Sequence, residues 1–518
     1  MFTALYNERA LALCTVALLI MVISIGVRPD SRRGAMAIMA PFLSILGLSA
    51  VARLAFWHRS VIRTAYLMLN LDRLSDPNHF DLKYPVAYGA LVWLVTLFHH
   101  PAGPPYGAAF GVLLVTGVLT PPLLYLVARE ITEDARMAFT VGLMAVLNPV
   151  HIIFTGHYDF YPVSLFYDAL LQLFLLRYLR TQRIPDLVAF ALASYLFCNS
   201  RVENHATFYV NTLVLLVGAR RIKAHRAPQV AVIVLYVAAH LAVQFDWSRS
   251  SLTEQHLVQN LPLAPLHLFG VFLNPRWNSL LDLRYSPPYL LPLMLVGLYT
   301  AIRRRSLAQR YEAMVLVAML LLYVDITDST VLWNARYFLN LLPALLMVSM
   351  GGLEHIGTRF PRVRQLAPWV VVLCFIPYIP MLWRFAFIAQ DEYVFYRDEV
   401  RPSLSRDVTV WKMSLPDEVF QWELRDHHLF ELDGYHVTND PNDLRPGDHL
   451  FIGINCYQML DSPLPIRPEC GAQLHDPRNV IVLHRRIAAR PFHIRAPWYV
   501  SGVWRQFQYI DLYLLRRR

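Results

Sequence analysis

The sequence predicts a polytopic α-helical membrane protein with about 11 or 12 spans and a small α/β domain at its C-terminal end. Two observations support this fold class. Of 518 residues, 56% are hydrophobic and only 16% are charged, whereas soluble domains have roughly 45–50% apolar and about 25% charged residues. In addition, apolar segments recur along most of the chain and are too long for the core helices of a soluble protein. A soluble enzyme, a disordered chain and a disulfide scaffold are therefore excluded.

The expected spans are apolar segments that approach the ~20 residues needed to cross a bilayer. The first has Glu8 and Arg9 before it and no small-residue cleavage site behind it, so we expect a retained span and not a signal peptide. Another stretch, Val86 to Phe98, is too short to span, and we expect an interfacial or re-entrant helix there. The spans are expected near residues 8–27, 36–56, 106–128, 137–153, 163–179, 186–199, 206–219, 228–244, 289–302, 311–326, 337–354 and 366–387.

The positions of the basic residues predict the orientation in the membrane, because cytoplasmic loops carry an excess of Lys and Arg. The short loops on one side contain almost no basic residues, only Arg201 and Arg336. We therefore expect the other side to be cytoplasmic and the net charge of +10 to reflect topology, not a nucleic-acid partner. The basic residues of the expected cytoplasmic side are Arg28, Arg32, Arg33, Arg129, Arg136, Arg177, Arg180, Arg183, Arg220, Arg221, Lys223, Arg226, Arg303, Arg304, Arg305, Arg310, Arg359, Arg362 and Arg364.

The composition changes sharply after residue 387. Turn signals such as Asn439-Asp440-Pro441-Asn442 and Arg445-Pro446-Gly447-Asp448 separate short alternating runs, a pattern typical of a small α/β domain. We expect three parts: an N-terminal extra span with a cytoplasmic loop at 1–34, a transmembrane domain at 35–387 with outer loops 57–105 and 245–288, and an extracytoplasmic soluble domain at 388–518.

Polar residues cluster at the outer ends of the spans, where a membrane enzyme acting on a lipid-linked substrate would place them. Carboxylates and imidazoles can accept the proton of an acceptor hydroxyl, and arginine stays charged beside a departing phosphate. The clusters contain Asp72, Asp76 and His79; His157 and Asp159; Arg201; and Arg336 with Tyr337.

Each cluster also has a purely structural interpretation. Ser75-Asp76-Pro77-Asn78 is a strong turn signal, and His157 and Asp159 can belong to an ordinary solvated loop. Arg336 can extend toward lipid headgroups, and Arg201 can form an ion pair with Glu203.

Several motifs occur in a characteristic order. Lys83-Tyr84-Pro85 precedes the expected interfacial helix, and Pro149 lies near the end of a span that runs into His157-Tyr158-Asp159. Later, Ala335-Arg336-Tyr337 leads into Leu342-Pro343-Ala344. Together with the topology, these motifs resemble the GT-C superfamily of polyprenyl-phosphate-sugar-dependent glycosyltransferases, which includes protein O-mannosyltransferases and the aminoarabinose transferase of lipid A. The resemblance covers most of residues 36–390.

The resemblance implies an integral-membrane glycosyltransferase that moves a sugar from a polyprenyl-phosphate donor to an extracytoplasmic lipid, glycan or protein acceptor. Some members use a divalent cation such as Mg or Mn, which Asp159 and His157 could hold here. The catalytic candidates are His58, Asp72, Asp76 and Asp159, and the substrate-binding candidates are His79, His157, Arg201, Arg336 and Tyr337.

The chain departs from the family at one important place. Family members usually carry an acidic residue just after the first catalytic span, whereas this chain has Phe56-Trp57-His58-Arg59 and no carboxylate before Asp72. Three alternatives stay open: Asp72 or Asp76 has taken over the role, His58 substitutes for it, or the protein has lost catalysis.

Two other functions compete with a glycosyltransferase. The first is a transporter or lipid flippase, which would have broken spans and ionisable residues at mid-membrane. Here the spans are expected to be apolar with charges at their outer ends, which favours the enzyme. The second is a catalytically inactive GT-C-like scaffold. The excess of Arg over Lys suggests a GC-rich genome, and we expect a bacterial inner membrane.

Cys456 and Cys470 are the only cysteines after the last expected span. The topology places both in an oxidising compartment, and the residues between them include Pro463, Pro465 and Pro468, which disfavour a regular helix. We therefore expect a disulfide between Cys456 and Cys470, with two unrelated thiols as the alternative.

Overall fold

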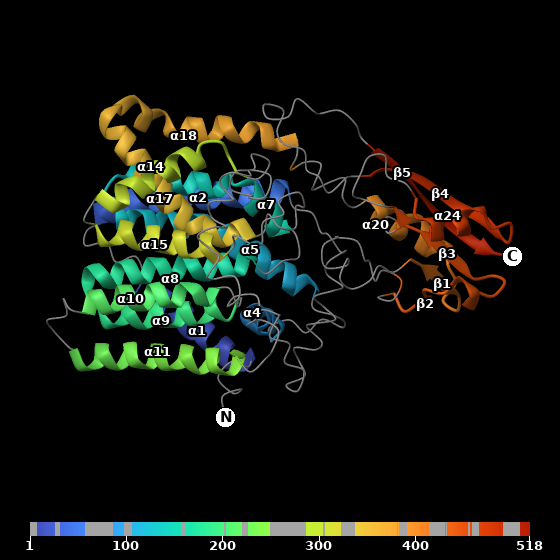
Figure 1. The fold of residues 1–518 in the computed structure, drawn as a ribbon, viewed down its shortest axis with the longest axis horizontal. Coiled ribbons are helices and arrows are strands. Elements are labelled where there is room, and N and C mark those ends of the chain that lie inside the picture. Colours follow the sequence, from blue (N-terminus) through green and yellow to red (C-terminus); the bar gives the residue numbers. More distant parts are fainter. Residues whose placement is uncertain are drawn as a thin grey trace.

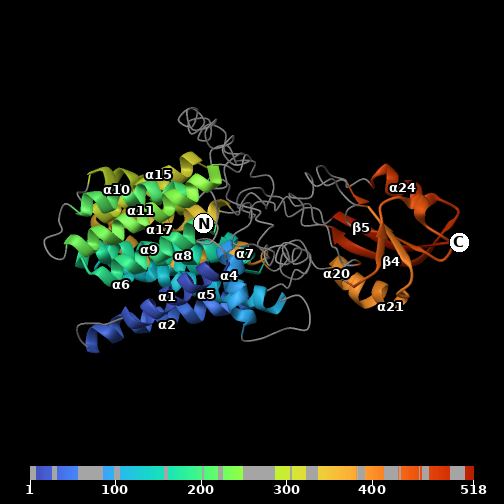
Figure 2. The same ribbon diagram turned by 90° about the horizontal axis from the view of Figure 1, so that it is seen from below.

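The chain forms a bundle of helices and a smaller domain built on a β-sheet, which follow one another along the long axis of the molecule (Figures 1 and 2). The computed structural model describes residues 8–25, 32–56, 86–97, 106–156, 161–200, 204–219, 226–248, 286–303, 306–322, 337–380, 382, 391–413, 430, 433–453, 456–457, 466–489 and 508–518. All statements below concern these residues.

Helices occupy every segment in which the sequence predicts a span. Most of their ends lie within a few residues of the expected ones, because long apolar segments leave little choice of structure inside a bilayer, whereas α18 and η5 cover Pro361 to Tyr378 in place of the expected 366–387. The helices are α1 (Glu8–Ile25), α2 (Arg32–Ala55), α5 (Tyr106–Ile131), α6 (Ala135–Val146), α7 (Pro149–Gly156), α8 (Tyr161–Thr181), α9 (Ile184–Cys198), α10 (His205–Ala219), α11 (Arg226–Ser248), α14 (Leu290–Arg303), α15 (Leu307–Leu322), α17 (Tyr337–Arg359) and α18 (Pro361–Phe375), which η5 (Ile376–Tyr378) extends.

Four of the described helices are long and apolar enough to cross a membrane, or five if the bent pair α6–α7 is one span. Several others are apolar but shorter, such as Ile184–Cys198 and Leu290–Arg303. Helices surrounded by other helices can be shorter than a lipid-exposed span. The structure therefore confirms a polytopic helical fold, and the larger number of spans stays a prediction.

The expected span at 137–153 is two helices rather than one. α6 ends at Val146, α7 begins at Pro149, and their axes differ by 52°. Proline lacks the N–H that would continue the helix. The side chain of Asn148 accepts a hydrogen bond from the backbone N–H of His151 at 2.9 Å, which begins α7 as a new helix.

A short helix also forms where the sequence predicts an interfacial or re-entrant one. α4 (Val86–Thr96) has 11 residues and packs against α1 and α5. Its residues Ala87, Tyr88, Ala90 and Val92 are buried. At 1.5 Å per residue the helix reaches only about half of the distance across a bilayer.

The bundle is held together by close contacts between helices that are distant in sequence. α14 packs along α17 at Gly297 and Gly352. A Cβ atom on Gly297 would overlap the carbonyl oxygen of Val348, and a Cβ atom on Gly352 would overlap that of Leu293. α5 packs against α2, α6 and α8. Small residues allow helices to approach this closely in a membrane protein.

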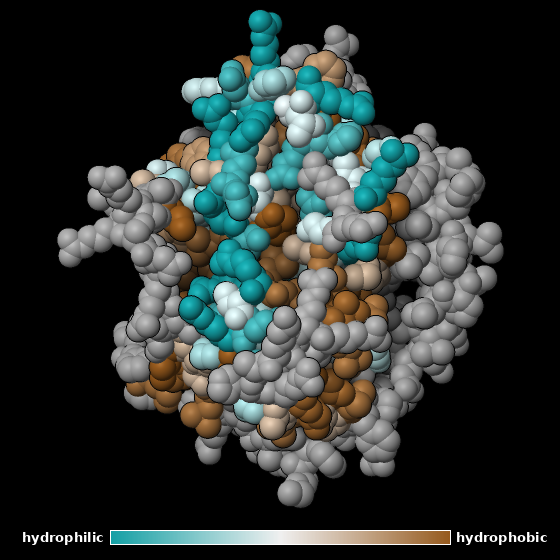
Figure 3. All heavy atoms as spheres, turned by 90° about the vertical axis from the view of Figure 1, so that its left-hand side faces the viewer, coloured by the Kyte–Doolittle hydropathy of each residue, from teal (hydrophilic) through white to brown (hydrophobic). Residues whose placement is uncertain are grey.

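Hydrophilic side chains gather at the end of the bundle that points away from the sheet domain (Figure 3). Two ion pairs there join neighbouring helices: Arg180 with Glu130 at 2.8 Å, and Arg364 with Asp134. This is the end at which the sequence predicts the cytoplasmic loops.

The sheet domain contains five strands in the order β2-β1-β3-β5-β4. β1 pairs with β2 and β3 in parallel, whereas β5 pairs with β3 and β4 antiparallel. The predicted α/β character is thus confirmed. The elements are α20 (Asp391–Phe395), η6 (Tyr396–Val400), α21 (Arg401–Ser403), β1 (Thr409–Lys412), β2 (His436–Thr438), η7 (Pro441–Asp443), β3 (His449–Ile452), α24 (Pro468–His475), β4 (Asn479–Ala489) and β5 (Gln508–Arg517).

The predicted turn Arg445-Pro446-Gly447-Asp448 leads into β3. Gly447 has a φ of 98°, a conformation that favours glycine. The Asp448 carboxylate accepts hydrogen bonds from the backbone N–H of Thr409 at 2.9 Å and of Arg445 at 2.8 Å, so it connects the turn to the start of β1.

Candidate functional site

The residues to which the sequence analysis gives catalytic or binding roles lie outside the described residues, apart from Tyr337. Tyr337 begins α17, and its side chain is not described. Their roles, and the expected convergence of Asp72, Asp76, His157 and Asp159, stay predictions. The residues outside the described ranges are His58, Asp72, Asp76, His79, His157, Asp159, Arg201 and Arg336.

The helices that border these residues lie together in the bundle. α2 ends at Ala55, just before His58, and α7 ends at Gly156, just before His157. α7 contacts α2, α5, α8 and α17. It lies at the end of the bundle that faces the sheet domain (Figures 1 and 2). The described ends of α2 and α7 therefore lie close to each other in the bundle.

A polar network joins the helices that follow Arg201 and Arg336. The amide nitrogen of Asn204 donates to the hydroxyl of Ser164 at 2.8 Å and to the carbonyl of Phe197 at 2.9 Å. The amide of Asn340 in α17 donates to the side-chain oxygen of Asn204 at 3.3 Å. The network thus joins the first turn of α17 to the residue that precedes α10.

Close packing fixes α7 against α5. A Cβ atom on Gly117 of α5 would meet the side-chain oxygen of Thr155 at 2.5 Å, so only glycine leaves room for Thr155. The Thr155 hydroxyl donates to the carbonyl of His151 one turn earlier, at 2.7 Å. In the same region, the hydroxyl of Ser49 in α2 donates to the carbonyl of Val118 in α5 at 2.9 Å.

Arg53 is a buried cation between these helices. It lies in the last turn of α2, and its side chain is only 2% exposed. Its Nη2 lies 2.7 Å from Nδ1 of His151, and its Nη1 donates to the carbonyls of Ser49 at 3.3 Å and Val146 at 3.5 Å. All of these partners are neutral groups or backbone, and the described part of the chain supplies no ion pair to Arg53.

The contact with Arg53 determines the state of His151. A guanidinium can only donate hydrogen bonds, so Nδ1 must act as the acceptor. His151 is then a neutral imidazole whose hydrogen is on Nε2. The sequence analysis did not single out Arg53 or His151, although both are visible as polar residues inside otherwise apolar segments.

Two buried carboxylates correct the expectation that the spans are apolar. Asp168 in α8 is 3% exposed and Glu312 in α15 is 1% exposed. Asp168 accepts a hydrogen bond from Gln172 at 3.1 Å, whereas neither carboxylate oxygen of Glu312 has a hydrogen-bond partner in the described structure. A single carboxylate changes the mean hydropathy of a long apolar segment very little. The expectation that the spans carry charges only at their outer ends was wrong for this reason.

The described residues contain no group of three or more His, Cys, Asp and Glu side chains able to hold a metal ion. The possible cation ligands His157 and Asp159 are outside those residues. A divalent cation therefore stays a prediction.

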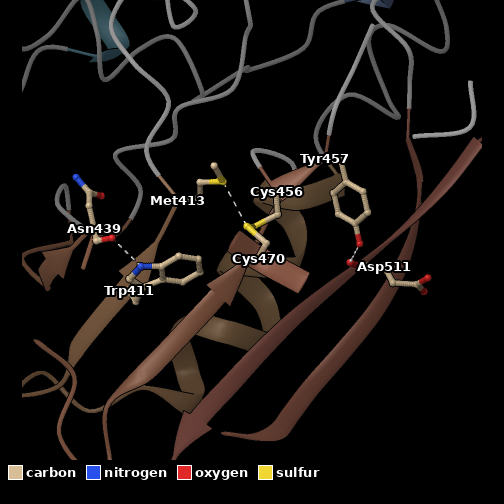
Figure 4. Close-up of a disulfide and its surroundings, with 7 residues drawn as sticks. All are labelled: Trp411, Met413, Asn439, Cys456, Tyr457, Cys470 and Asp511. Carbon is tan, nitrogen blue, oxygen red and sulfur yellow. Dashed lines mark hydrogen bonds between the residues drawn. A yellow bond between two sulfur atoms is a disulfide. The ribbon is translucent and has the colours of Figure 1, made fainter. Parts of the chain in front are cut away.

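Cys456 and Cys470 form a disulfide in the sheet domain (Figure 4), with their Cα atoms 5.6 Å apart. This is the pairing that the sequence predicts. The sulfur of Met413 lies 3.4 Å from Sγ of Cys470. The Tyr457 hydroxyl donates to the carbonyl of Asp511 in β5 at 2.5 Å, and burial raises the pKa of Tyr457 to about 12. The disulfide and Tyr457 together connect α24 and β5.

Comparison with known proteins finds no protein-family model and no curated protein that matches the chain. The solved structures that are similar to it include two of ArnT. The first is ArnT from Cupriavidus metallidurans bound to undecaprenyl phosphate, with 13% identity, a TM-score of 0.48, and coverage of 93% of this chain and 98% of that chain. The second is ArnT from the same organism in the apo state, with 11% identity, a TM-score of 0.47, and coverage of 80% and 93%.

Proposed function

We propose that the protein is an integral-membrane glycosyltransferase that transfers a sugar from a polyprenyl-phosphate donor to an extracytoplasmic acceptor. The observation that supports this most directly is the arrangement of helix ends. α2, α7, α10 and α17 each border a predicted site residue, and the contacts of α7 and of Asn204 bring these borders together. In the sequence, residues of both required kinds, proton acceptors and cations, stand next to these helix ends.

The orientation that this function needs also has support. The hydrophilic end of the bundle, with Arg180 and Arg364, points away from the sheet domain (Figure 3). Under the positive-inside rule that end is cytoplasmic. The predicted site and the sheet domain then lie on the extracytoplasmic side of what we take to be a bacterial inner membrane.

The reaction would use the predicted residues as follows. A hydroxyl oxygen of the acceptor bonds to the anomeric carbon as the bond from that carbon to the donor phosphate oxygen breaks. Asp72, Asp76, Asp159 or His58 takes the hydroxyl proton. Arg201 or Arg336 stabilises the negative charge of the departing polyprenyl phosphate.

The test is incubation of the full-length protein in lipid nanodiscs with radiolabelled polyprenyl-phosphate sugars. We expect donor cleavage or transfer, and a roughly 10²–10⁴-fold lower rate when the residue that acts as the base is changed, in Asp72→Asn, Asp76→Asn or Asp159→Asn. The exposed Asp407 in the sheet domain provides a matched control, Asp407→Asn, whose rate should equal that of the wild type. Persistent absence of cleavage and transfer would contradict the proposal and favour an inactive scaffold.

A transporter or lipid flippase is the second candidate function. The buried carboxyl groups of Asp168 and Glu312 favour it, because ionisable residues inside spans often mark ion or proton pathways. Movement of an intact labelled lipid-linked sugar between leaflets, without cleavage, would support this alternative. Loss of that movement in Glu312→Gln would connect it to the buried carboxyl group.

A further inference from the structure

The two edges of the sheet differ in length. β2, at one edge, has three residues, whereas β4, at the other edge, has 11. An edge strand presents a row of backbone N–H and C=O groups that no neighbouring strand has paired. Among the described strands, β4 pairs with β5 alone. Its outer edge is therefore the longer template that the sheet offers to an additional strand.

Two apolar side chains are exposed on β4. Ile481 is 53% exposed and Val482 is 42% exposed, and these two are the exposed large hydrophobic residues of the sheet domain as far as the structure describes it. Val482 forms a bulge, because the pairing passes from Ile481 opposite Leu515 to Leu483 opposite Leu514. Apolar residues on an exposed strand edge favour the addition of another chain.

The residues that follow the bulge are basic. β4 runs from the apolar residues 480–483 to His484, Arg485 and Arg486, and it contains no acidic residue. Alternate residues of a strand point to the same face of a sheet, and the partners of Ile481, His484 and Arg486 alternate along β5. These partners are Leu515, Tyr513 and Asp511. One face of this edge therefore has an apolar half followed by a basic half.

Positive charge around β4 exceeds the negative charge beside it in the described part of the sheet domain. The basic residues of β4, of β5 and of the turn before β4 are Arg478, His484, Arg485, Arg486, Arg516 and Arg517. Three described carboxylates pair with them or lie opposite them: Glu399, Asp476 and Asp511. Two of these are shared, because Asp476 accepts from Arg478 at 2.7 Å and from Arg517 at 3.0 Å. Asp511 lies opposite Arg486 and 2.8 Å from His484. A partner segment that brings further carboxylates is therefore favoured.

β4 begins at the end of the molecule that lies away from the bundle. Asn479 pairs with Arg517, and the C-terminal end of the chain lies at the far end of the sheet domain in both views (Figures 1 and 2). Ile481 and Val482 follow Asn479 by two and three residues. They are thus distant from the membrane that surrounds the bundle, which favours a protein over a lipid surface as the partner.

We propose that the outer edge of β4 binds an extended segment of a partner protein, one half of which is apolar and the other half acidic. The segment adds a sixth strand to the five-stranded sheet. Its apolar half contacts Ile481 and Val482, and its carboxylates face His484 and Arg486. This interaction goes beyond the proposed function, because it requires neither sugar transfer nor any residue of the predicted catalytic clusters.

Two alternatives make different predictions. A bulge and charged side chains can simply protect an edge strand from pairing, in which case β4 binds no peptide. A second copy of the chain could also occupy the edge. Two copies related by a twofold axis pair antiparallel, however, which places the apolar half of one β4 against the basic half of the other.

The experiment measures binding of two labelled synthetic peptides to the full-length protein in lipid nanodiscs by fluorescence anisotropy. The acidic peptide is Val-Thr-Val-Thr-Glu-Thr-Glu-Thr, which places Val and Glu on one face of a strand. The basic peptide has Lys in place of Glu. Each is also made with the reversed sequence, because the added strand can run parallel or antiparallel to β4. We expect the acidic peptide to bind at least about tenfold more tightly than the basic one in one of the two directions.

Three variants locate the binding. Arg486→Glu should weaken binding of the acidic peptide about tenfold and strengthen binding of the basic one. Arg406→Glu makes the same change at an exposed position of the sheet domain outside β4 and β5, and it should leave both affinities unchanged. Ile481→Ser removes the apolar contact and no charge, so it should weaken both peptides about threefold. This variant keeps the test informative if Arg486→Glu does not fold.

Hydrogen exchange shows whether the bound peptide forms a strand. Pairing along the outer edge should slow the exchange of backbone N–H groups in β4, whereas a purely electrostatic contact with the arginines should leave it unchanged. Slower exchange in β4 together with the preference for the acidic peptide supports the proposal. Equal affinity for the two peptides, unchanged exchange in β4, or full binding in Ile481→Ser would overturn it. Dimers that form through β4 without any peptide binding would identify a second copy as the occupant and overturn it as well.

Discussion

At the scale of single residues, Arg336 offers a direct test of donor recognition. If it neutralises the donor phosphate, Arg336→Ala leaves that phosphate unpaired and should weaken donor binding by ~2–5 kcal/mol. The thermal midpoint of unfolding should change little. Isothermal titration with the lipid-linked donor measures the effect, and Arg310→Ala, at an exposed position on the opposite end of the bundle, is the matched control. Unchanged donor affinity in Arg336→Ala would exclude the role.

Asp476 should make the stability of the sheet domain dependent on pH. Hydrogen bonds from the guanidinium and backbone N–H of Arg478, and from Arg517 at 3.0 Å, hold the pKa of the Asp476 carboxyl well below its ordinary value. The folded-state pKa is thus lower than the unfolded-state value of about 3.9. The stabilisation is fully present above that unfolded-state value and is lost as pH falls through the folded-state pKa.

Thermal unfolding of the full-length protein at about pH 6 and about pH 3 checks this expectation. The wild type should lose more stability on acidification than Asp476→Asn, because the variant has no carboxylate to protonate. An equal loss in the two proteins would show that other groups govern acid sensitivity.

The sequence shows which residue types can do the chemistry, but burial of a single residue depends on tertiary packing. Arg53 belongs to an apolar span, and only the approach of α6 and α7 reveals that it is enclosed next to His151. Glu312 was missed for the same reason. The pairing of Cys456 with Cys470 could be predicted because they are the only two cysteines after the last expected span.

At the scale of elements, the contact of α14 with α17 predicts a strong position dependence of Gly→Ala substitutions. Gly297→Ala places a Cβ atom against the Val348 carbonyl oxygen, so the helices must separate, and we expect a loss of about 1–3 kcal/mol. Gly47 in α2 has open space at its Cβ position, so Gly47→Ala should be neutral or slightly stabilising. Thermal unfolding in detergent compares the two, and equal midpoints would contradict the close packing.

The disulfide should stabilise the sheet domain. It closes a segment with a sequence separation of 14, for which the chain-entropy estimate is roughly 3 kcal/mol. The double variant Cys456→Ser/Cys470→Ser should therefore be cleaved by protease in β4 and β5 at a lower temperature than the wild type. Mass spectrometry of non-reduced peptides checks the bond itself, and two free thiols in protein from the native membrane would refute it.

Element positions follow from sequence more readily than element order. Apolar length predicts the helices, and Pro149 explains why one expected span became α6 and α7. The strand order β2-β1-β3-β5-β4 could not be predicted. Strands as short as β2 and β3 contain too few alternating apolar and polar residues to indicate which strands they pair with.

At the scale of the whole molecule, the orientation in the membrane is the assumption on which the function depends. A membrane-impermeant maleimide should label Asn442→Cys, which is exposed in the sheet domain, when it is added to intact cells. It should label Glu133→Cys, which is exposed at the hydrophilic end of the bundle, only after the membrane has been permeabilised. The wild type gives the background from Cys14, Cys198 and Cys374. The reverse labelling pattern would show that the protein has the opposite orientation in the membrane.

The strand order has a consequence for how the protein matures. β5 lies between β3 and β4, although it follows both in the chain. If the sheet domain lies on the extracytoplasmic side, as we propose, translocation from the N-terminal end brings β3 and β4 across the membrane before the strand that joins them. For that interval two strand edges lack partners, which is the state most open to wrong pairing. With that orientation, the sheet domain can complete its fold only once the chain through Arg517 has crossed the membrane.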